Sequence, residues 1–520
     1  MIVITCLPVG MLCWPQSCLK IFWRRGCLTC RSPPPGLLIQ MLFADLEYWI
    51  FLGVCLSLYL FVPARGRAGF LLLASYFFYL QRNAEHGLLL AISTVLDYSL
   101  ALGMGRVKDQ GRRKLLLLGS IFGNLGLLAA FKYRVVFSTL AGWLGFAPVG
   151  EVTGIESVIL PLGISFYTFQ TLGYSIDVFR KRIAPCRNFI DYALYVSFFP
   201  QLIAGPIERA NHLIPQLQSL GGLTKENASA GGRLCLWGLL KKLVIADHMR
   251  EPLMQSFRDP AAQDSLYLVM TAVGLAVYLY LDFSAYTDMA RGTARIFGVT
   301  LVLNFNRPFT ATGIGEFTRR WHMSLVSWIR DYVHWPLTRG GATGHVALWK
   351  ANIVILTVFG VWHGAKWNYV VWCVAWGIMI SIDGSLRLRA LHKRRERGEL
   401  GRRFRRRSRV RAVAGCLLTG ILWSFLVLGL FAGSLTEALA FLSQIAELRP
   451  PSRETLQMLA WTLPVLVGLW LAHAAGSVFD LDRVWIRLNT LSRATFVLGS
   501  LVALAFLRVK EPLDFVYFRF

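Results

Sequence analysis

Long apolar runs separated by short basic loops dominate the sequence. Roughly 20 apolar residues cross a bilayer core as a helix, and shorter runs can tilt or insert partway. A membrane β-barrel would instead show shorter segments of alternating polarity. The pattern therefore predicts an all-α polytopic membrane protein with about 10 to 13 membrane helices. The runs are Leu46–Val62, Gly69–Leu80, Gly87–Met104, Leu115–Phe131, Val158–Val178, Phe189–Ala204, Leu234–Ala246, Leu266–Phe283, Val346–Trp362, Trp367–Ile382, Ala412–Phe431, Leu456–Ala475 and Ala494–Leu507.

The composition excludes the other broad classes. Of the 520 residues, 55% are hydrophobic and 16% are charged, and the mean hydropathy is +0.50. Soluble domains carry roughly 25% charged residues, so this chain has too few charges to coat several soluble domains. Disordered and fibrous proteins are excluded by the same numbers.

The net charge of +26 is concentrated in loops. The segment Arg387–Arg411 is the most basic, and the positive-inside rule places it in the cytoplasm. A basic loop facing anionic lipid explains it better than nucleic-acid binding does. When successive loops are assigned alternately to the two sides of the membrane, the assignment is inconsistent over Gly205–His345. Re-entrant or interfacial helices are therefore expected there.

The first 40 residues differ from the rest. They hold five of the ten cysteines, including Cys27 and Cys30, but no second pair follows with the spacing of a zinc site, and we expect no metal. Their order of basic and apolar residues is the reverse of a secretory signal. Because the composition changes at Met41, we expect translation to begin there; the alternative is a disordered extension.

Two polar clusters lie near membrane boundaries. In FFPQLIAGPIER (Phe198–Arg209), the Gly205-Pro206 pair breaks the helix before two charges. In YLDFSAYTDMARGTARIFG (Tyr280–Gly298), Asp282 and Tyr286 share one helix face, and Ser284 and Asp288 share the next. Pairing of these carboxylates with Arg291 and Arg295 is the favoured interpretation, and orientation of a catalytic histidine is the alternative.

The segment Asn304–Leu337 is too polar to span a bilayer and too aromatic for an ordinary loop. A short helix at the interface or dipping into the membrane fits it. The arginines can meet the phosphates of a nucleotide-like donor or of lipid headgroups. The candidate residues here are Asn306, Arg319, Arg320, Trp321, His322, Arg330, Asp331 and Tyr332.

His363 is the strongest candidate for chemistry. In VFGVWHGAKWN it ends an apolar helix beside Trp362 and Gly364, and the glycine leaves space for a substrate. Histidine suits general acid/base catalysis because its ordinary pKa lies near neutral pH. A snorkelling or hydrogen-bonded histidine at a helix end is the structural alternative. His248 and His473 lie outside the clusters, and alanine is expected to be tolerated at both.

These clusters, together with LNFNRPF, FTRRWHMSLVSWIRDYVHWPLTRGG and VFGVWHGAKW in the same order, resemble the membrane-bound O-acyltransferase family and its bacterial alginate O-acetyltransferase branch. The resemblance runs from Met41 to about Ile382. It implies a helical bundle with re-entrant helices around a central cavity. It also implies that His363 is the catalytic histidine and His322 a second functional one. His334 departs from the family pattern and has no assigned role.

The resemblance implies transfer of acetyl groups from a cytoplasmic donor, acetyl-CoA, across the inner membrane to an exopolysaccharide, with alginate favoured. A periplasmic acetyltransferase partner would complete the transfer; no tightly bound cofactor is expected. One alternative is a sibling enzyme that acetylates cellulose or peptidoglycan, or transfers D-alanine to teichoic acid. A polysaccharide or lipid-linked-sugar transporter is the remote alternative, because no internal repeat is visible.

The predicted organisation has four parts. They are an extension at 1–40, a catalytic membrane core at 41–383, a basic cytoplasmic loop at 384–411 and C-terminal membrane helices at 412–520.

Overall fold

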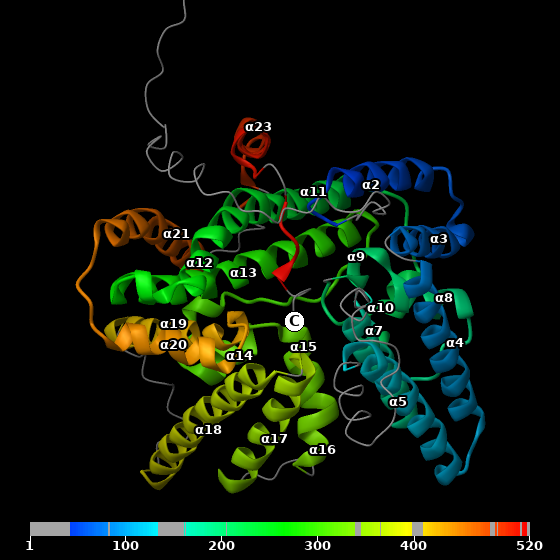
Figure 1. Ribbon diagram of the computed structural model, residues 1–520. Helices are drawn as coiled ribbons and strands as arrows, with labels where there is room; N and C mark the ends of the chain where they lie inside the picture. Colours follow the sequence, from blue (N-terminus) through cyan, green and yellow to red (C-terminus); the bar gives the residue numbers. More distant parts are fainter. Residues whose placement is uncertain are drawn as a thin grey trace, which may run out of the picture. The chain divides into compact units, whose positions relative to one another are not determined.

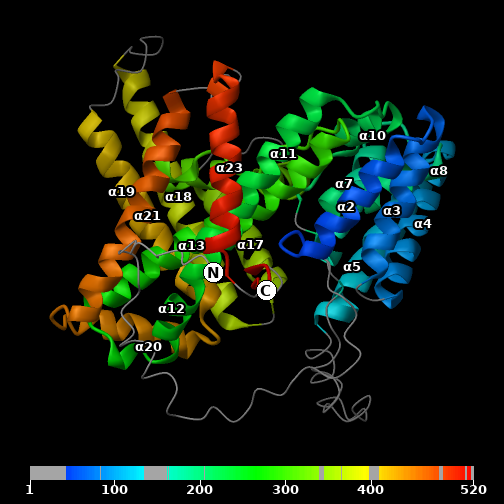
Figure 2. The ribbon, with the colours of Figure 1, turned by 90° about the horizontal axis from the view of Figure 1, so that it is seen from above.

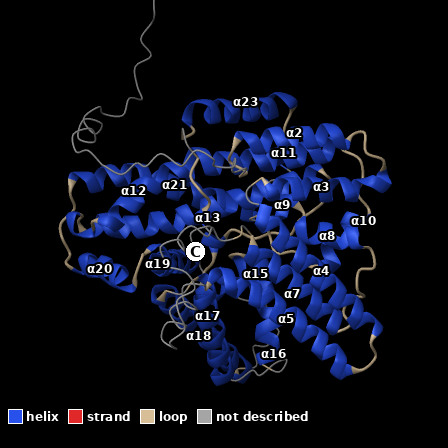
Figure 3. Ribbon diagram, turned by 45° about the vertical axis from the view of Figure 1, so that its right-hand side comes forward, coloured by secondary structure: helices blue, strands red, loops and turns tan. Residues whose placement is uncertain are grey.

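The chain is described by a computed structural model in which every regular element of the described part is a helix (Figure 3). The described residues are 42–81, 84–133, 161, 163–203, 205–338, 345–364, 366–397, 409–478, 484–485, 487–509 and 512–516. The predicted extension at 1–40 and the predicted start at Met41 lie outside them.

Eight helices in the described ranges are long and apolar enough to cross a membrane, which confirms the all-α polytopic class. They are α4 (Ala84–Arg106), α5 (Gln110–Lys132), α13 (Ser265–Ile296), α17 (His345–His363), α18 (Trp367–Glu396), α19 (Arg409–Phe431), α21 (Arg453–Val478) and α23 (Thr490–Leu507).

The other predicted runs form shorter helices, so fewer full-length spans appear in the described part than the 10 to 13 expected. The shorter helices are α2 (Leu46–Tyr59), α3 (Arg67–Leu80), α7 (Ile164–Phe179), α8 (Phe189–Ser197), α9 (Phe199–Leu202), α10 (Ala210–Gln218), α11 (Lys225–Leu239), α12 (Asp247–Arg258), α14 (Ile314–Arg320), α15 (Met323–Ile329), α16 (Trp335–Leu337) and α20 (Leu435–Ala446).

One run is not a single helix. The stretch Phe189–Ala204 is divided at Phe198, whose φ of −48° and ψ of 106° are not helical. The division lies two residues before Pro200, which fits the first turn of a new helix but not the interior of an old one. The stretch Gly205–His345, for which non-spanning helices were expected, contains the short helices α10, α14, α15 and α16.

Helix α13 is the centre of the arrangement. Figures 1 and 2 both show α2 to α5 on one side of it and α18 to α21 on the other. It is also the most deeply buried of the eight apolar helices. By contrast, α5 exposes large apolar side chains such as Leu115 (69% exposed) and Phe122 (71%), as a lipid-facing helix does.

Two adjacent lysines neutralise the carboxylates of α13. They lie on a π-helical turn, η3 (Leu240–Ala246), that continues α11. The Lys241 ammonium lies 2.7 Å from Asp288 Oδ2 and 2.9 Å from Ser284 Oγ, on one face of α13. The Lys242 ammonium lies 2.8 Å from Asp282 Oδ1, on the face shared with Tyr286. The two predicted faces of α13 are thus confirmed.

The partners of these carboxylates differ from those expected. Arg291 lies 3.6 Å from Asp288, in addition to Lys241. Arg295 instead donates to Thr300 Oγ1 at 2.8 Å. The physical reason is where the side chains start. Both arginines lie beyond the carboxylates toward the C-terminal end of α13, whereas the lysines lie on a helix packed along α13 and reach the carboxylates from the side.

The C-terminal part of the chain is tied to the same core. Asp247 Oδ1 lies 2.7 Å from Lys242, so two fully buried carboxylates share one ammonium. Backbone N–H groups supply the remaining donors: Val516 donates to Asp282 at 2.8 Å and Leu513 to Asp247 at 3.3 Å. Between them the ring of Phe515 is fully buried.

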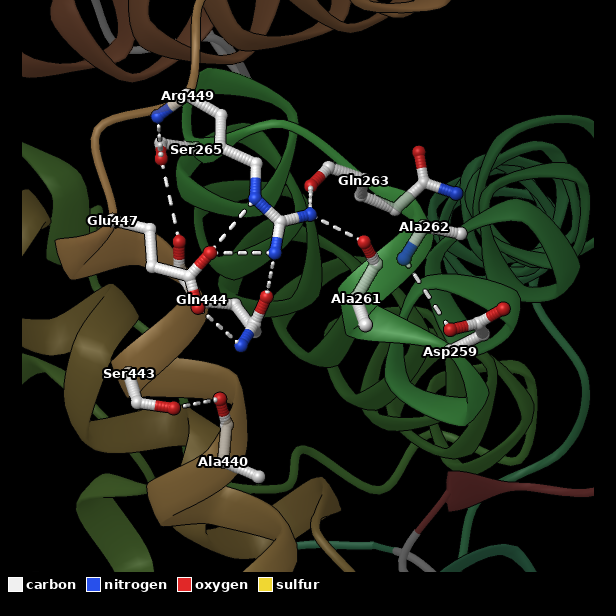
Figure 4. A network of polar contacts seen from close by, with 10 residues as sticks. All are labelled: Asp259, Ala261, Ala262, Gln263, Ser265, Ala440, Ser443, Gln444, Glu447 and Arg449. Carbon is white, nitrogen blue, oxygen red and sulfur yellow. Dashed lines mark hydrogen bonds and ion pairs between the residues drawn. The ribbon is translucent and has the colours of Figure 1, made fainter.

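A second set of hydrogen bonds joins the loop after α20 to the start of α13. The Arg449 guanidinium donates to Glu447, to Gln444 and to the carbonyl groups of Ala261 and Gln263 (Figure 4). Its backbone N–H donates to Ser265 Oγ at 2.9 Å. These bonds satisfy the donors of one arginine and fix α20 against the loop that precedes α13.

Helix α18 enters the basic segment that was predicted as a loop. It continues to Glu396, so residues 384–396 are helical, and its last turns carry Arg387, Arg389 and Lys393. Residues 398–408 lie outside the described part.

We predict that Lys242→Met destabilises the protein far more than Lys241→Met. Removal of Lys242 leaves two buried carboxylates without a cation, which costs about 3–5 kcal/mol. Asp288 is 18% exposed and keeps Arg291 when Lys241 is removed. The thermal unfolding midpoints of the two variants in detergent test this, and equal midpoints would contradict the shared-ammonium account.

Candidate active site

An apolar cavity of about 260 Å³ brings together the two histidines singled out in the sequence. His322 lies between α14 and α15, and His363 is the last residue of α17. The walls come from α13, α14, α15, α17, α18 and α19. Aromatic rings form much of the lining, among them Trp372, Trp376 and Trp423.

His363 is buried among indole rings. Its ring centroid lies 4.8 Å from that of Trp362 and 5.2 Å from that of Trp372. The close packing of α17 on α18 that produces this arrangement depends on Gly360. A Cβ there would lie 2.6 Å from the Cα of Val370 and 2.8 Å from the carbonyl oxygen of Tyr369. The glycine therefore sets the position of the histidine one turn later.

His322 is held in a left-handed backbone conformation, with φ of 41°. A non-glycine residue in this region is uncommon and is found where the surroundings enforce it. Its side chain is 3% exposed, and Nδ1 lies 3.2 Å from Asn304 Oδ1. Burial lowers the pKa of His322 to about 3, so the ring is neutral across the physiological range.

The basic residues at the cavity are Arg319, Arg330 and His334. Within the segment predicted to dip into the membrane, Arg319 lies on α14, and Arg330 and His334 lie on the π-helical turn that follows α15. Burial lowers the pKa of His334, which favours its neutral form. Charged donors in the wall of an otherwise apolar cavity can bind an anionic group, and the apolar wall can hold an apolar one.

The remaining predicted residues surround the cavity without lining it. Arg320 pairs with Glu316 at 2.7 Å, and Asp331 pairs with Arg209 at 3.2 Å. The Tyr332 hydroxyl donates to Asp177 at 2.6 Å. Trp362 contacts His363 and carries the Lys132 ammonium 4.9 Å above its ring.

Three predicted residues lie outside the site. Asp282 and Asp288 bind the lysines of η3, as described above. Asn306 is exposed, and its backbone N–H donates to the Arg320 carbonyl at 3.0 Å. The buried asparagine of the LNFNRPF motif is Asn304, two residues earlier, which is fully buried and contacts His322.

Sequence reasoning missed Asn304, Asn352, Cys373 and the tryptophans of α18. Trp372 and Trp376 are one turn apart, so a helical stripe was visible in the sequence. Nothing in the sequence distinguished Asn304 from Asn306. In the described part of the chain, no three His, Cys, Asp or Glu side chains are grouped as metal ligands are.

His473 is closer to the site than its place in the sequence suggested. Its Nε2 lies 2.8 Å from the Tyr280 hydroxyl, and the Tyr280 ring contacts Trp321. His248 is exposed on α12, outside the cavity. Of these two histidines, His248 is therefore the better control.

Comparison with known proteins settles the family. The family model of MBOAT, the membrane-bound O-acyltransferase family, matches residues 127–404, which include both histidines and most of the residues that line the cavity. The chain belongs to the membrane-bound O-acyltransferase family. It is a membrane-bound O-acyltransferase with several spanning helices.

The proteins to which the chain is similar are named for different polymers. The chain is 35% identical over 352 residues to a probable alginate O-acetylase AlgI of Azotobacter vinelandii, covering 66% of this chain and 69% of that protein. It is 33% identical to a peptidoglycan O-acetyltransferase of Helicobacter pylori, covering 60% and 63%. It is 29% identical to a teichoic acid D-alanyltransferase of Bacillus subtilis, covering 42% and 57%.

We predict that Gly360→Ala lowers the rate of acyl transfer by about 10- to 100-fold. The added methyl group would push α17 from α18 and displace His363, and a shift of about 1 Å at a catalytic group can cost 100-fold. Gly384→Ala is the matched control, since no heavy atom lies within 4 Å of a Cβ at that position of α18. Equal rates for the two variants would contradict the proposed dependence on the helix contact.

Proposed function

We propose that this enzyme passes acetyl groups from acetyl-CoA in the cytoplasm across the inner membrane for O-acetylation of an exopolysaccharide, with alginate as the polymer. One observation carries the proposal: two histidines from separate motifs line one apolar cavity with arginines at its wall. The similarity to proteins named as alginate O-acetylases supports the polymer.

His363 is assigned as the general base. It takes the proton of the attacking hydroxyl as that oxygen bonds to the acyl carbon. The bond from the acyl carbon to sulfur then breaks, and the proton passes to the departing thiolate. The attacking hydroxyl belongs to a sugar or to a serine of a partner protein. General-base catalysis contributes about 10²- to 10⁴-fold, or about 3–5 kcal/mol.

Binding of the acyl donor, acetyl-CoA, is assigned to the arginines of the cavity. Arg319 and Arg330 are the charged groups best placed to meet the phosphates of acetyl-CoA, because both line the cavity in a segment that also carries His322. The aromatic wall would hold the uncharged arm of the donor. An acyl group could then reach His363 without movement of the whole donor across the membrane.

The orientation follows from the basic segment. Arg387, Arg389 and Lys393 at the end of α18 are placed in the cytoplasm by the positive-inside rule. His363 and the start of α18 then lie toward the outer face. A periplasmic acetyltransferase would receive the acetyl group there and finish the transfer to the polymer.

Peptidoglycan is the second candidate polymer, because the peptidoglycan O-acetyltransferase of Helicobacter pylori is similar over nearly as much of the chain. Deletion of the gene separates the two. Acetyl content is measured in the secreted polysaccharide and in the isolated peptidoglycan. Loss from the secreted polymer supports the proposal, and loss from peptidoglycan alone overturns it in favour of the second candidate.

We predict that His363→Ala abolishes measurable O-acetylation while membrane levels of the protein stay normal. His322→Ala should also reduce it severely, because its ring lines the same cavity. His248→Ala is the control and should retain wild-type acetylation. Complementation of the deletion strain, with acetyl content and immunoblots of the membrane fraction, measures all three. Near-wild-type acetylation by His363→Ala would contradict the assigned role.

A further inference from the structure

A buried asparagine links the two segments that meet at His322. Asn304 is fully buried, and its backbone carbonyl accepts the Met323 N–H at 2.8 Å. Two residues later, Asn306 N–H donates to the Arg320 carbonyl at 3.0 Å. These bonds hold the chain around Asn304 alongside the left-handed turn that carries His322.

The Asn304 amide is itself oriented by a chain of hydrogen bonds. The Ile207 N–H donates to Ser324 Oγ at 3.0 Å, and Ser324 Oγ donates to Asn304 Oδ1 at 2.6 Å. A backbone N–H can only donate, so the serine accepts at Ile207 and its single proton is available for Asn304. Asn304 Nδ2 donates to Thr287 Oγ1 at 3.5 Å, which completes the orientation.

Glu208 holds the segment from which the Ile207 N–H donates to Ser324. The carboxylate is 1% exposed, and it accepts the Val302 N–H at 2.6 Å and contacts His212 Nδ1 at 2.7 Å. The hydrogen bond from Glu208 raises the pKa of His212. The residues after Gly205 are thereby fixed both to the segment before Asn304 and, through Ser324, to Asn304 itself.

The orientation of Asn304 decides which nitrogen of His322 carries the proton. Asn304 Oδ1 lies 3.2 Å from His322 Nδ1 and is an acceptor. A neutral imidazole has one N–H and one lone pair, so a proton on Nδ1 leaves the lone pair on Nε2. The ring plane is fixed as well, because Phe283 lies edge-on at 4.8 Å and Phe166 is stacked at 6.3 Å.

We propose that Asn304 is a positioning residue for acyl transfer. It holds His322 as the neutral tautomer protonated on Nδ1, which leaves Nε2 as the hydrogen-bond acceptor of a ring that lines the cavity. The inference rests on the proposed function for the acyl transfer that this ring would assist. The tautomer itself does not depend on that function.

The tautomer is tested directly in the purified protein. Solid-state NMR of 15N-histidine-labelled enzyme in lipid at pH 7 distinguishes protonated from unprotonated ring nitrogens, and the signals missing in His322→Phe assign His322. The proposal requires Nδ1 to be protonated and Nε2 not. A proton on Nε2, or a fully protonated ring, overturns it, whatever polymer the enzyme acetylates.

We predict that Asn304→Ala lowers the acetylation rate about 10- to 100-fold, the usual size of an orienting contact. Asn304→Asp should keep more activity because a carboxylate also accepts from Nδ1. It should raise the pKa of His322, so activity falls as pH drops through the raised value. The wild-type ring, with its pKa near 3, gives no such loss between pH 5 and 8.

The control is Asn124→Ala. Asn124 is as buried as Asn304, but its side chain forms hydrogen bonds with Asp97 and Ser93 and not with His322. Initial rates from radiolabelled acetyl-CoA in membrane vesicles, corrected for protein level, give the pH profiles. A shift for Asn304→Asp and none for Asn124→Ala supports positioning. Parallel losses with unchanged profiles for both Asn304 variants would assign a structural role and overturn it. If wild-type vesicles transfer no acetyl group, the proposed function is contradicted. The tautomer of His322 is still tested by the NMR measurement.

Discussion

Charge inside a membrane protein has to be paired, and the pairing of two carboxylates on α13 organises this fold. Asp282 and Asp288 recruit adjacent lysines from the turn after α11, and the widened turn allows both lysines to face α13. Backbone N–H groups of Leu513 and Val516 donate to the two carboxylates that Lys242 pairs with. The same helix presents Phe283 to His322 and Leu279 to the cavity, so the charged core and the candidate site share one support.

The site combines neutral histidines, an apolar wall and a few charges. Burial keeps the imidazole of His322 neutral, so the ring can accept a proton. His322 has a strained, left-handed backbone, and α17 meets α18 at a glycine with no room for a methyl group. The hydrogen bonds of Asn304 and Ser324 join the segment after Gly205 to His322 in the candidate site.

The sequence predicted those features that follow from periodicity and composition. The helices, their approximate limits and the two faces of α13 all agree with the structure. Features that depend on long-range contact were not predictable. Lys241 and Lys242 looked like ordinary members of an apolar run, and only packing on α13 gives them partners. Asn304 and Asn306 are equivalent in the sequence, because which one is buried depends on the chain paired with them.

The central claim is that one cavity holds the acyl group between His322 and His363. A cryo-electron microscopy map of the enzyme with an unreactive thioether analogue of acetyl-CoA tests it most directly. The account predicts density for the acyl end in the cavity lined by both histidines, with the phosphates toward Arg319 and Arg330. Density for the acyl end elsewhere, with this cavity empty, would contradict it.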